Sequence, residues 1–283
     1  MPPPNGACGS LYVVATPIGN LGDMSERAVT VLKSVATIAC EDTRVTGVLL
    51  RRFGIATPML AYHDHNAEHV RPQILARLET GQSFALVSDA GTPLISDPGY
   101  KLVKDCADAG IAVIPVPGAS APLAALMGAG LPTDRFYFGG FLPPKSKARC
   151  DALAEVKPLK ATLVFFESPH RIAATLRDMA DVLGARPAAV GRELTKLHEE
   201  FRRGTLAELA AFYESAETRG EIVVVVNGAG DSDAQAAPLD IRSALTDALK
   251  SMSVRDAADT VAKATGTARR EVYALALELA KEK

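Results

Sequence analysis

The sequence predicts an α/β protein in which two α/β domains are followed by a short helical module. Short strand-like runs alternate with amphipathic helical patterns in the first half of the chain, which is typical of a mostly parallel sheet, and the second half is expected to have its own sheet, rich in β-branched residues. Several of these runs end in small or turn-forming residues. A segment rich in Gly, Ala and Asp then precedes purely helical patterns. The expected divisions are a disordered tail 1–10, an N-terminal α/β domain 11–118, a C-terminal α/β domain 119–228, a linker 229–238 and a helical module 239–283.

The composition limits the possible classes of protein. Hydrophobic residues make up 48% of the 283, so a sizeable core is expected. The net charge of −2 gives no overall attraction to polyanions, so any nucleic-acid surface must be a local patch. The 4 cysteines are scattered and form no CxxC pair, which suits a reducing cytoplasm and indicates neither a zinc site nor a disulfide framework. We expect no signal peptide in 1–10 and no membrane-spanning segment.

The stretch from Phe84 to Gly99 is the most informative part of the chain. An apolar strand, Phe84–Val87, ends abruptly in Ser88 and Asp89 and is followed by glycines and prolines. Open α/β sheets bind ligands at the carboxyl ends of their strands. Gly91 allows close approach to the backbone, and the Asp89 carboxylate can accept hydrogen bonds from a ligand. The alternative is an ordinary connection in which Asp97 caps the next helix.

Two earlier strands end in the same way. Leu11–Ala15 runs into a Gly/Pro loop, and Asp23 and Glu26 have the spacing of a capping box for the following helix. Pro17 in this loop argues against a dinucleotide-binding fingerprint. Thr37–Cys40 ends in two acids, a Thr and an Arg, which form either an internal ion network or part of a crevice.

His63 and His65 have the spacing of metal ligands, but no third ligand follows nearby. We therefore expect no metal, and we expect Asp64 and Asn66 to cap the next helix. A further helix, Lys101–Ala109, and a strand, Ala112–Val116, lead to a run of small residues that includes Ser120, and the boundary between the two domains is expected within this run.

The second domain is predicted from four strands. The last of them is the most apolar run in the chain, so we expect it to be central and buried on both faces. The strands are Phe136–Phe141, Thr162–Phe166, Ala188–Gly191 and Glu221–Val226. After the first of them, Lys145, Lys147 and Arg149 lie in a loop that either contacts phosphates or is simply solvated.

Three helical patterns end the chain. Ser253 and Asp256 have the spacing of a capping box, and Gly266 breaks the pattern before the last helix, which begins near Arg269 and Arg270. Short helices with a Gly-containing turn are typical of a helix-turn-helix module. Plain packing or dimerisation is the alternative.

Five motifs in order carry a resemblance to a known family. They are Thr16-Pro17-Ile18-Gly19-Asn20-Leu21, Glu41-Asp42-Thr43-Arg44, Ser88-Asp89-Ala90-Gly91-Thr92-Pro93, Pro117-Gly118-Ala119-Ser120 and Phe166-Glu167-Ser168-Pro169-His170-Arg171. Together they resemble the tetrapyrrole methylase superfamily and, within it, the branch that acts on ribosomal RNA. The resemblance implies S-adenosylmethionine bound in a cleft between two α/β domains, and a homodimer. It also implies 2′-O-methylation of a cytidine of 16S rRNA at the decoding centre, with the assembled 30S subunit as a partner.

The same resemblance implies cofactor-binding residues by position. They are Pro17, Asp89, Gly91, Thr92, Ile95, Ser120, Ala121, Phe166 and Ile222. Departures from the tetrapyrrole-modifying members, namely the first two motifs and the helical module, favour the ribosomal RNA branch.

A ribose hydroxyl is a poor nucleophile at neutral pH, so a positioned base would help methyl transfer. The candidates are Glu41, Asp42, His63, His65, Glu167, Glu193 and Lys196. We expect Glu167 first, because it ends a strand, with Lys196 and Glu41 as the other catalytic residues. The alternative for Glu167 is a structural pairing with Arg171.

Phosphate contacts are expected from eight cations: Arg44, Arg51, Lys145, Lys147, Arg149, Arg171, Arg202 and Arg203. Two other functions stay open, a methyltransferase acting on a precorrin or sirohaem-type tetrapyrrole and a non-catalytic RNA-binding protein.

Overall fold

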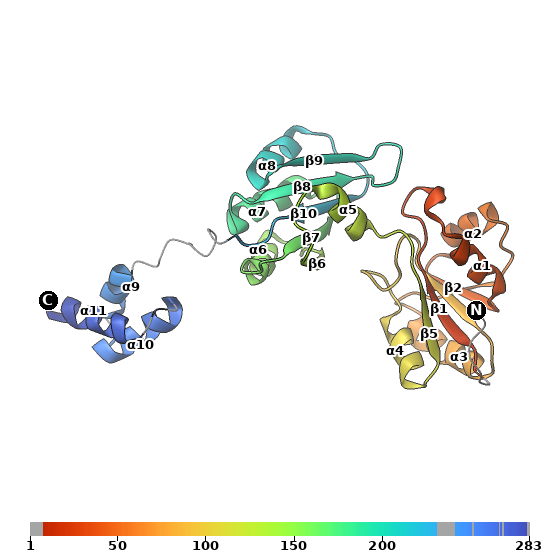
Figure 1. Ribbon diagram of the computed structural model, residues 1–283, viewed down its shortest axis with the longest axis horizontal. Helices are drawn as coiled ribbons and strands as arrows, with labels where there is room; N and C mark the ends of the chain where they lie inside the picture. The colour runs from red at the N-terminus through yellow and green to blue at the C-terminus, as the bar shows by residue number, and fades with distance from the viewer. Residues whose placement is uncertain (1–7, 231–240, 251, 266, 268, 282–283) are drawn as a thin grey trace. The chain divides into compact units, whose positions relative to one another are not determined.

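The computed structural model describes residues 8–230, 241–250, 252–265, 267 and 269–281 (Figure 1). The chain divides into two compact units, Met1–Gly228 and Ala229–Lys283. Most of the predicted tail 1–10 and of the predicted linker 229–238 lies outside the described residues, and those domain bounds stay predictions. No described helix is both long enough and apolar enough to cross a membrane.

The first unit begins with a five-stranded sheet in which every pairing is parallel. In the order β3-β2-β4-β1-β5 it contains β1 (Ser10–Val14), β2 (Thr37–Cys40), β3 (Met59–Ala61), β4 (Phe84–Val87) and β5 (Ala112–Val116). A short 3-10 helix, η1 (Leu21–Asp23), and four α-helices connect the strands: α1 (Glu26–Ser34), α2 (Thr43–Arg52), α3 (Ala67–Glu79) and α4 (Tyr100–Asp108). Separate apolar clusters cover the sheet, one packed with α1 and α2 and one with α3 and α4.

The second sheet is mixed. In the order β6-β7-β10-β8-β9 it contains β6 (Phe136–Phe141), β7 (Thr162–Glu167), β8 (Pro187–Arg192), β9 (Glu200–Thr205) and β10 (Ile222–Val226). Only β6 and β7 pair in parallel; β10 is antiparallel to both of its neighbours. The expectation of a mostly parallel sheet is therefore confirmed for the first sheet, and the antiparallel pairings of the second sheet were not predicted. The prediction that the last strand is central and buried is confirmed, because all five residues of β10 are buried.

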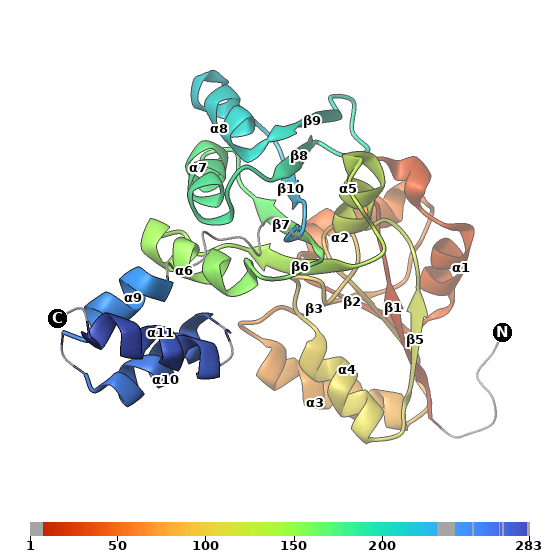
Figure 2. The same cartoon turned by 60° about the vertical axis from the view of Figure 1, so that its left-hand side comes forward.

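Four helices cover the second sheet: α5 (Ala121–Ala129), α6 (Ser146–Val156), α7 (Ile172–Leu183) and α8 (Leu206–Ser215). The core on one face packs α6, α7 and α8 against the strands. The smaller core on the other face packs α5 against the sheet and also includes Ile18, which follows β1. Figure 2 shows α5 apart from α7 and α8, on the other side of the β7-β10-β8 strands.

Two local predictions are wrong. The side-chain cap of α1 is Ser25, whose Oγ accepts a hydrogen bond from the Ala28 amide at 3.1 Å, whereas Asp23 belongs to η1. The alternative in which Asp97 caps α4 is not observed either, because Gly99 is the residue that precedes this helix. The prediction that Asp64 and Asn66 cap the next helix is also wrong: Asn66 precedes α3, but this helix has no side-chain cap among the described residues, and the Asn66 side chain bonds backward, accepting from the His63 amide and donating to a carbonyl.

The second unit is a three-helix module made of α9 (Ile241–Ala248), α10 (Val254–Thr265) and α11 (Arg269–Lys281). Its core is built mainly from small residues of α10 and α11 with Leu245 of α9. The Ser253 Oγ accepts a hydrogen bond from the Asp256 amide at 3.2 Å, which confirms the predicted cap. The predicted break at Gly266 lies outside the described residues.

Candidate active site

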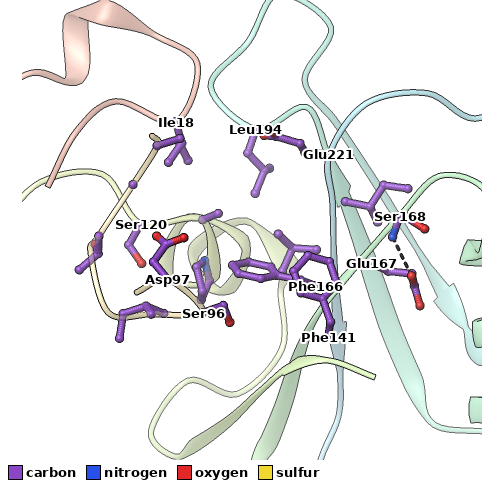
Figure 3. Close-up of a pocket in the computed structure, with 18 of the residues that line it drawn as sticks. Ile18, Ser96, Asp97, Ser120, Phe141, Phe166, Glu167, Ser168, Leu194 and Glu221 are labelled. Carbon is purple, nitrogen blue, oxygen red and sulfur yellow. Dashed lines mark hydrogen bonds between the residues drawn. The ribbon is translucent and has the colours of Figure 1, made fainter. Parts of the chain in front are cut away.

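The first unit contains a cavity of about 360 Å³ that is lined from both sheets (Figure 3). Figure 3 shows Asp97 and Ser120 on one side and Phe141 and Phe166 on another. A cavity of this size that combines apolar walls with a few polar groups is typical of a small-molecule site. We call it the central pocket.

Strand ends build the central pocket. The first sheet supplies Ile18 after β1 and the segment 90–97 after β4. The connection between the two sheets supplies Ser120 and Ala121 at the start of α5. The second sheet supplies the carboxyl ends of β6 and β7 together with the amino end of β10. Those ends meet at one edge because β10 is antiparallel to β7, with Ile222 opposite Glu167.

Two close approaches join the halves beside the pocket. A Cβ added to Gly140, in the irregular part of β6, would lie 3.2 Å from the Ser96 Oγ. A Cβ added to Gly19 would lie 2.3 Å from the Lys196 Cγ, so the lysine stem packs directly on the loop after β1. The loops from the two halves are therefore in contact around the pocket.

Backbone strain gathers in the same two loops. Among the described residues, the non-glycine residues with a left-handed backbone are Leu94 (φ 76°), Ser96 (φ 63°), Glu193 (φ 50°) and Thr195 (φ 64°). Such conformations cost about 1–3 kcal/mol each and persist where the surroundings fix them, commonly at ligand sites. The strain therefore lies in the two loops that contribute Ser96 and Leu194 to the pocket lining.

Burial and neighbouring charge perturb several carboxyl groups here. Burial raises the pKa of Asp97, and the negative charge of Asp89 adds to that increase. Burial also raises the pKa of Glu41, with contributions from Asp89, Asp97 and a further aspartate. In contrast, a hydrogen bond from Lys196 lowers the pKa of Glu193. The edge of the first sheet is thus acidic, and its carboxylates repel one another.

Most of the predicted cofactor-binding residues line the central pocket: Gly91, Thr92, Ile95, Ser120, Ala121, Phe166 and Ile222. Pro17 and Asp89 line a separate groove beside α2 instead. Sequence position alone could not separate them, because neighbouring residues of an extended segment face opposite sides.

Glu167 ends β7 as expected, but its carboxylate is occupied. The side chain is buried, Oε1 accepts from the Ser168 amide at 2.7 Å, and Oε2 accepts from the Thr175 Oγ1 at 2.6 Å. Arg171 Nε lies 3.4 Å from Oε1. Figure 3 shows the carboxylate directed away from the middle of the pocket. This geometry favours the structural pairing with Arg171 over the expected role as a base.

The other two predicted catalytic residues lie outside the lining of the pocket. Lys196 Nζ is 2.8 Å from Glu193 Oε1 and 3.1 Å from Glu221 Oε2. Glu193 Oε1 also accepts from the Glu221 amide at 3.0 Å, so the three residues fix the loop after β8 to the start of β10. Glu41 is half-buried at the end of β2, where the nearby aspartates raise its pKa.

The prediction of Arg149 as a phosphate contact is wrong. Its side chain is only 4% exposed and forms an ion pair with Asp178, with Nε donating at 2.7 Å. A further nitrogen, Nη1, donates to the carbonyls of Pro143 and Pro144. Arg149 therefore holds the loop 142–145 onto α7, while Lys145 and Lys147 beside it are exposed.

The remaining predicted cations differ in how far their side chains are free to contact a phosphate. Arg44 is 89% exposed but paired with Asp42, and Arg51 is exposed. Arg171 donates to the Leu142 and Pro143 carbonyls. Arg202 lies over the Phe212 ring and pairs with Glu200, and Arg203 donates to the Gly128 and Ala129 carbonyls. In this arrangement Arg171, Arg202 and Arg203 are at least partly committed to the fold.

Among the described residues, no group of three or more His, Cys, Asp or Glu side chains could hold a metal ion. His63 and His65 do lie together, with ring centroids 6.0 Å apart.

Two family models match the chain. Residues 10–210 match the Tetrapyrrole (Corrin/Porphyrin) Methylases, and residues 235–280 match the RsmI C-terminal HTH domain. Curated relatives named "Ribosomal RNA small subunit methyltransferase I" include one from Mesorhizobium japonicum, 52% identical over 95% of this chain and 92% of the relative. Another, from Escherichia coli O157:H7, is 46% identical over 95% of each chain.

Solved structures resemble the first unit. A uroporphyrin-III C-methyltransferase from Thermus thermophilus complexed with S-adenyl homocysteine has a TM-score of 0.53 at 19% identity, covering 77% of this chain and 97% of its own. A cobalt precorrin-4 methyltransferase has a TM-score of 0.57 at 16% identity, covering 77% and 94%. At these identities the likeness shows the fold alone.

Proposed function

Because the chain belongs to the tetrapyrrole (corrin/porphyrin) methylase family and matches ribosomal RNA small subunit methyltransferases over nearly its whole length, we propose that it methylates the 2′-hydroxyl of a cytidine in 16S rRNA at the decoding centre. It is a methyltransferase of ribosomal RNA. The observation that carries this function is the extent of the match, which continues through residues 235–280. The cited tetrapyrrole enzymes cover only 77% of the chain.

S-adenosylmethionine fits the central pocket by size and by chemistry. A volume of about 360 Å³ is within the usual range for small-molecule sites. The Phe166 ring, supported by Phe138 and Phe141 at centroid distances of 5.0 and 5.4 Å, offers an aromatic surface to an adenine. Across the pocket, the Asp97 carboxylate offers an acceptor to an ammonium group. The bound cofactor supplies an electrophilic methyl group on a sulfonium.

The chain itself contributes positioning and a base. The two halves hold their loops together through the Ser96–Gly140 and Lys196–Gly19 contacts, which fixes the pocket before binding. Glu41 stays our candidate for the base, although its side chain does not line the central pocket: burial and the charge of Asp89 raise its pKa, and a carboxyl with a raised pKa accepts a proton better at neutral pH. Lys196 acts as a positioning residue. Glu167 anchors the turn into α7.

RNA binding is assigned to the exposed cations Arg44, Arg51, Lys145 and Lys147, with the three-helix module as an added contact. Each phosphate contact steepens the salt dependence of binding by about one unit. We place the protein in the cytoplasm, acting as a homodimer on the assembled 30S subunit.

The test is methyl transfer from labelled S-adenosylmethionine to 30S subunits that lack the modification. The RNA is digested to nucleosides, and the label is identified by chromatography. The proposal predicts 2′-O-methylcytidine. Label on a base, or bound cofactor without label in RNA, contradicts it, and the second result favours a small-molecule substrate. Absence of cofactor binding leaves only a non-catalytic RNA-binding protein.

A further inference from the structure

Beside the central pocket lies a second hollow of about 390 Å³, which we call the α2 groove. Its lining comes from the loop after β1, from α2 and from the end of β4: Pro17, Gly19, Leu21, Val45, Val48, Leu49, Arg52 and Asp89. Three aliphatic side chains are unusually exposed in it, Leu21 at 45%, Val45 at 46% and Val48 at 60%. The groove is therefore apolar on its sides and open to solvent.

A thin wall of backbone separates the groove from the central pocket. Thr16 and Gly91 exchange two backbone hydrogen bonds, of 2.9 and 3.1 Å, so the loops after β1 and β4 pair as short strands. Residues then alternate between the two hollows: Pro17 and Gly19 line the groove, and Ile18 lines the pocket. Because the wall is one extended segment thick, a ligand in the groove lies close to the cofactor pocket.

The charged groups at the groove are one carboxylate and two neighbouring arginines. Asp89 is exposed, and its Oδ1 accepts from the Asp42 amide at 3.1 Å, which leaves its other oxygen free among the described residues. Arg52 lines the groove, Arg51 precedes it, and neither has a carboxylate partner in the part of the chain that the structure describes. The groove thus combines apolar sides, one carboxylate acceptor and adjacent cations.

We infer that the α2 groove holds the unstacked base of the target nucleotide. This inference rests on the proposed function. Enzymes that act on one nucleotide commonly extrude it, and apolar sides contact the flat base while arginines bind flanking phosphates. A carboxylate only accepts hydrogen bonds, so Asp89 favours a base with an exocyclic amine, such as the N4 amine of cytosine, over the O4 of uracil.

Val48→Arg tests the occupant of the groove, with Thr30→Arg as its control. Thr30 is also β-branched and exposed, on neighbouring α1, and lies outside both hollows. Added positive charge by itself strengthens RNA binding, whereas a long side chain in the groove excludes the base. We expect Val48→Arg to lower kcat/KM for 30S methylation by about 10- to 100-fold, the range for loss of a stacked base. Thr30→Arg should match the wild type.

Two further measurements on Val48→Arg accompany the methylation rates. Affinity for S-adenosylhomocysteine, measured by calorimetry, and molecular mass by light scattering should be unchanged in Val48→Arg. Wild-type rates, a parallel loss of cofactor affinity, or a change of mass that marks the groove as an interface between copies of the chain would each overturn the inference.

Asp89→Asn tests base selection. With 30S subunits that carry either cytidine or uridine at the modified position, the wild type should prefer cytidine, and the variant should lose about 10- to 100-fold of that preference. Its affinity for S-adenosylhomocysteine should stay that of the wild type. An unchanged preference, or a lost affinity, contradicts the assignment of Asp89. If the wild type methylates neither substrate, the proposed function itself has failed.

Discussion

The two sheets of the first unit contribute to the central pocket by different routes. In the parallel sheet, every strand points the same way, so only carboxyl ends reach the ligand edge, and they bring loop backbone and aspartates. In the mixed sheet, β10 runs against its neighbours, so its amino end and the two residues before it reach the pocket beside the carboxyl ends of β6 and β7 and the loop after β8. That sheet brings aromatic and aliphatic side chains.

The parallel sheet therefore supplies the charged groups that can recognise a ligand, and the mixed sheet supplies the apolar surface against which it packs. The acidic edge of the parallel sheet presents charges whose pKa values respond to one another, as at Glu41 and Asp97. The mixed sheet presents a preformed apolar wall in which Phe166 contacts two other rings. We therefore expect changes on the first side to alter selectivity and pH dependence, and changes on the second to alter stability and affinity.

The largest expected effect is a loss of stability on the mixed-sheet side, which distinguishes a cation that holds the fold together from one that is free to contact RNA. Arg149→Met leaves the Asp178 carboxylate, which is only 14% exposed, without its ion-pair partner, so it should lower the free energy of unfolding by about 3–5 kcal/mol. Lys147→Met, on the same helix but exposed, should change it by about 0.5 kcal/mol or less. Chemical denaturation measures both.

RNA affinity should show the reverse order, because only Lys147 is free to contact phosphate. Its loss should reduce the salt slope of 30S binding by about one unit. Equal stability of the two variants would contradict the structural role of Arg149, and an unchanged salt slope would remove Lys147 from the RNA surface.

The next effect concerns the point where the halves meet. Ala121→Trp places an indole in the central pocket at the start of α5 and should weaken S-adenosylhomocysteine binding by about 10- to 100-fold. Ala207→Trp, at an exposed position near the start of α8, is the control and should bind normally. Equal calorimetric affinities would show that the cofactor does not use this pocket.

A smaller effect tests Glu167. Glu167→Gln keeps one amide oxygen to accept from the Ser168 amide, and its NH2 group can donate to the Thr175 hydroxyl instead of accepting from it, but the charge is removed, so we expect a loss of about 1–2 kcal/mol in unfolding free energy. The single-turnover methylation rate of the folded variant should stay within a few-fold of wild type. A general base would instead lose about 10²- to 10⁴-fold, and that result would restore Glu167 to catalysis.

The sequence predicts where the strands end, but not to which face of the sheet each side chain points. The strand over 162–166 was predicted nearly as observed, yet Phe166 faces the pocket while Glu167 turns to α7, because successive residues of a strand point to opposite sides. The burial of Arg149 depends on Asp178, 29 residues away, which no local pattern reveals.

The groove was missed for a related reason. Arg52 and Val48 come from a helix that the sequence presents only as amphipathic, and their pairing with the loop after β1 is a tertiary contact. The signal that pointed toward it was the run of cations at the end of α2.

The smallest effect is the pH dependence of the link between the loop after β8 and the start of β10. The pKa of Glu193 is lowered by its Lys196 hydrogen bond, so the stabilisation is present above the unfolded value and is lost as pH falls through the folded value. Lys196→Met should lower the unfolding free energy at pH 7 by about 1 kcal/mol or less. The difference between wild type and variant should shrink as pH falls below about 4. If the difference in unfolding free energy does not change with pH, the stabilisation comes from packing of the lysine stem and not from the ion pair.

The most direct test is a crystal structure with bound S-adenosylhomocysteine. We expect the ligand in the central pocket, contacting the segment 90–97 from the parallel sheet and Phe166 from the mixed sheet, with the α2 groove left free for RNA. Density for the ligand in the α2 groove, against Pro17 and Asp89, would contradict the assignment of both hollows.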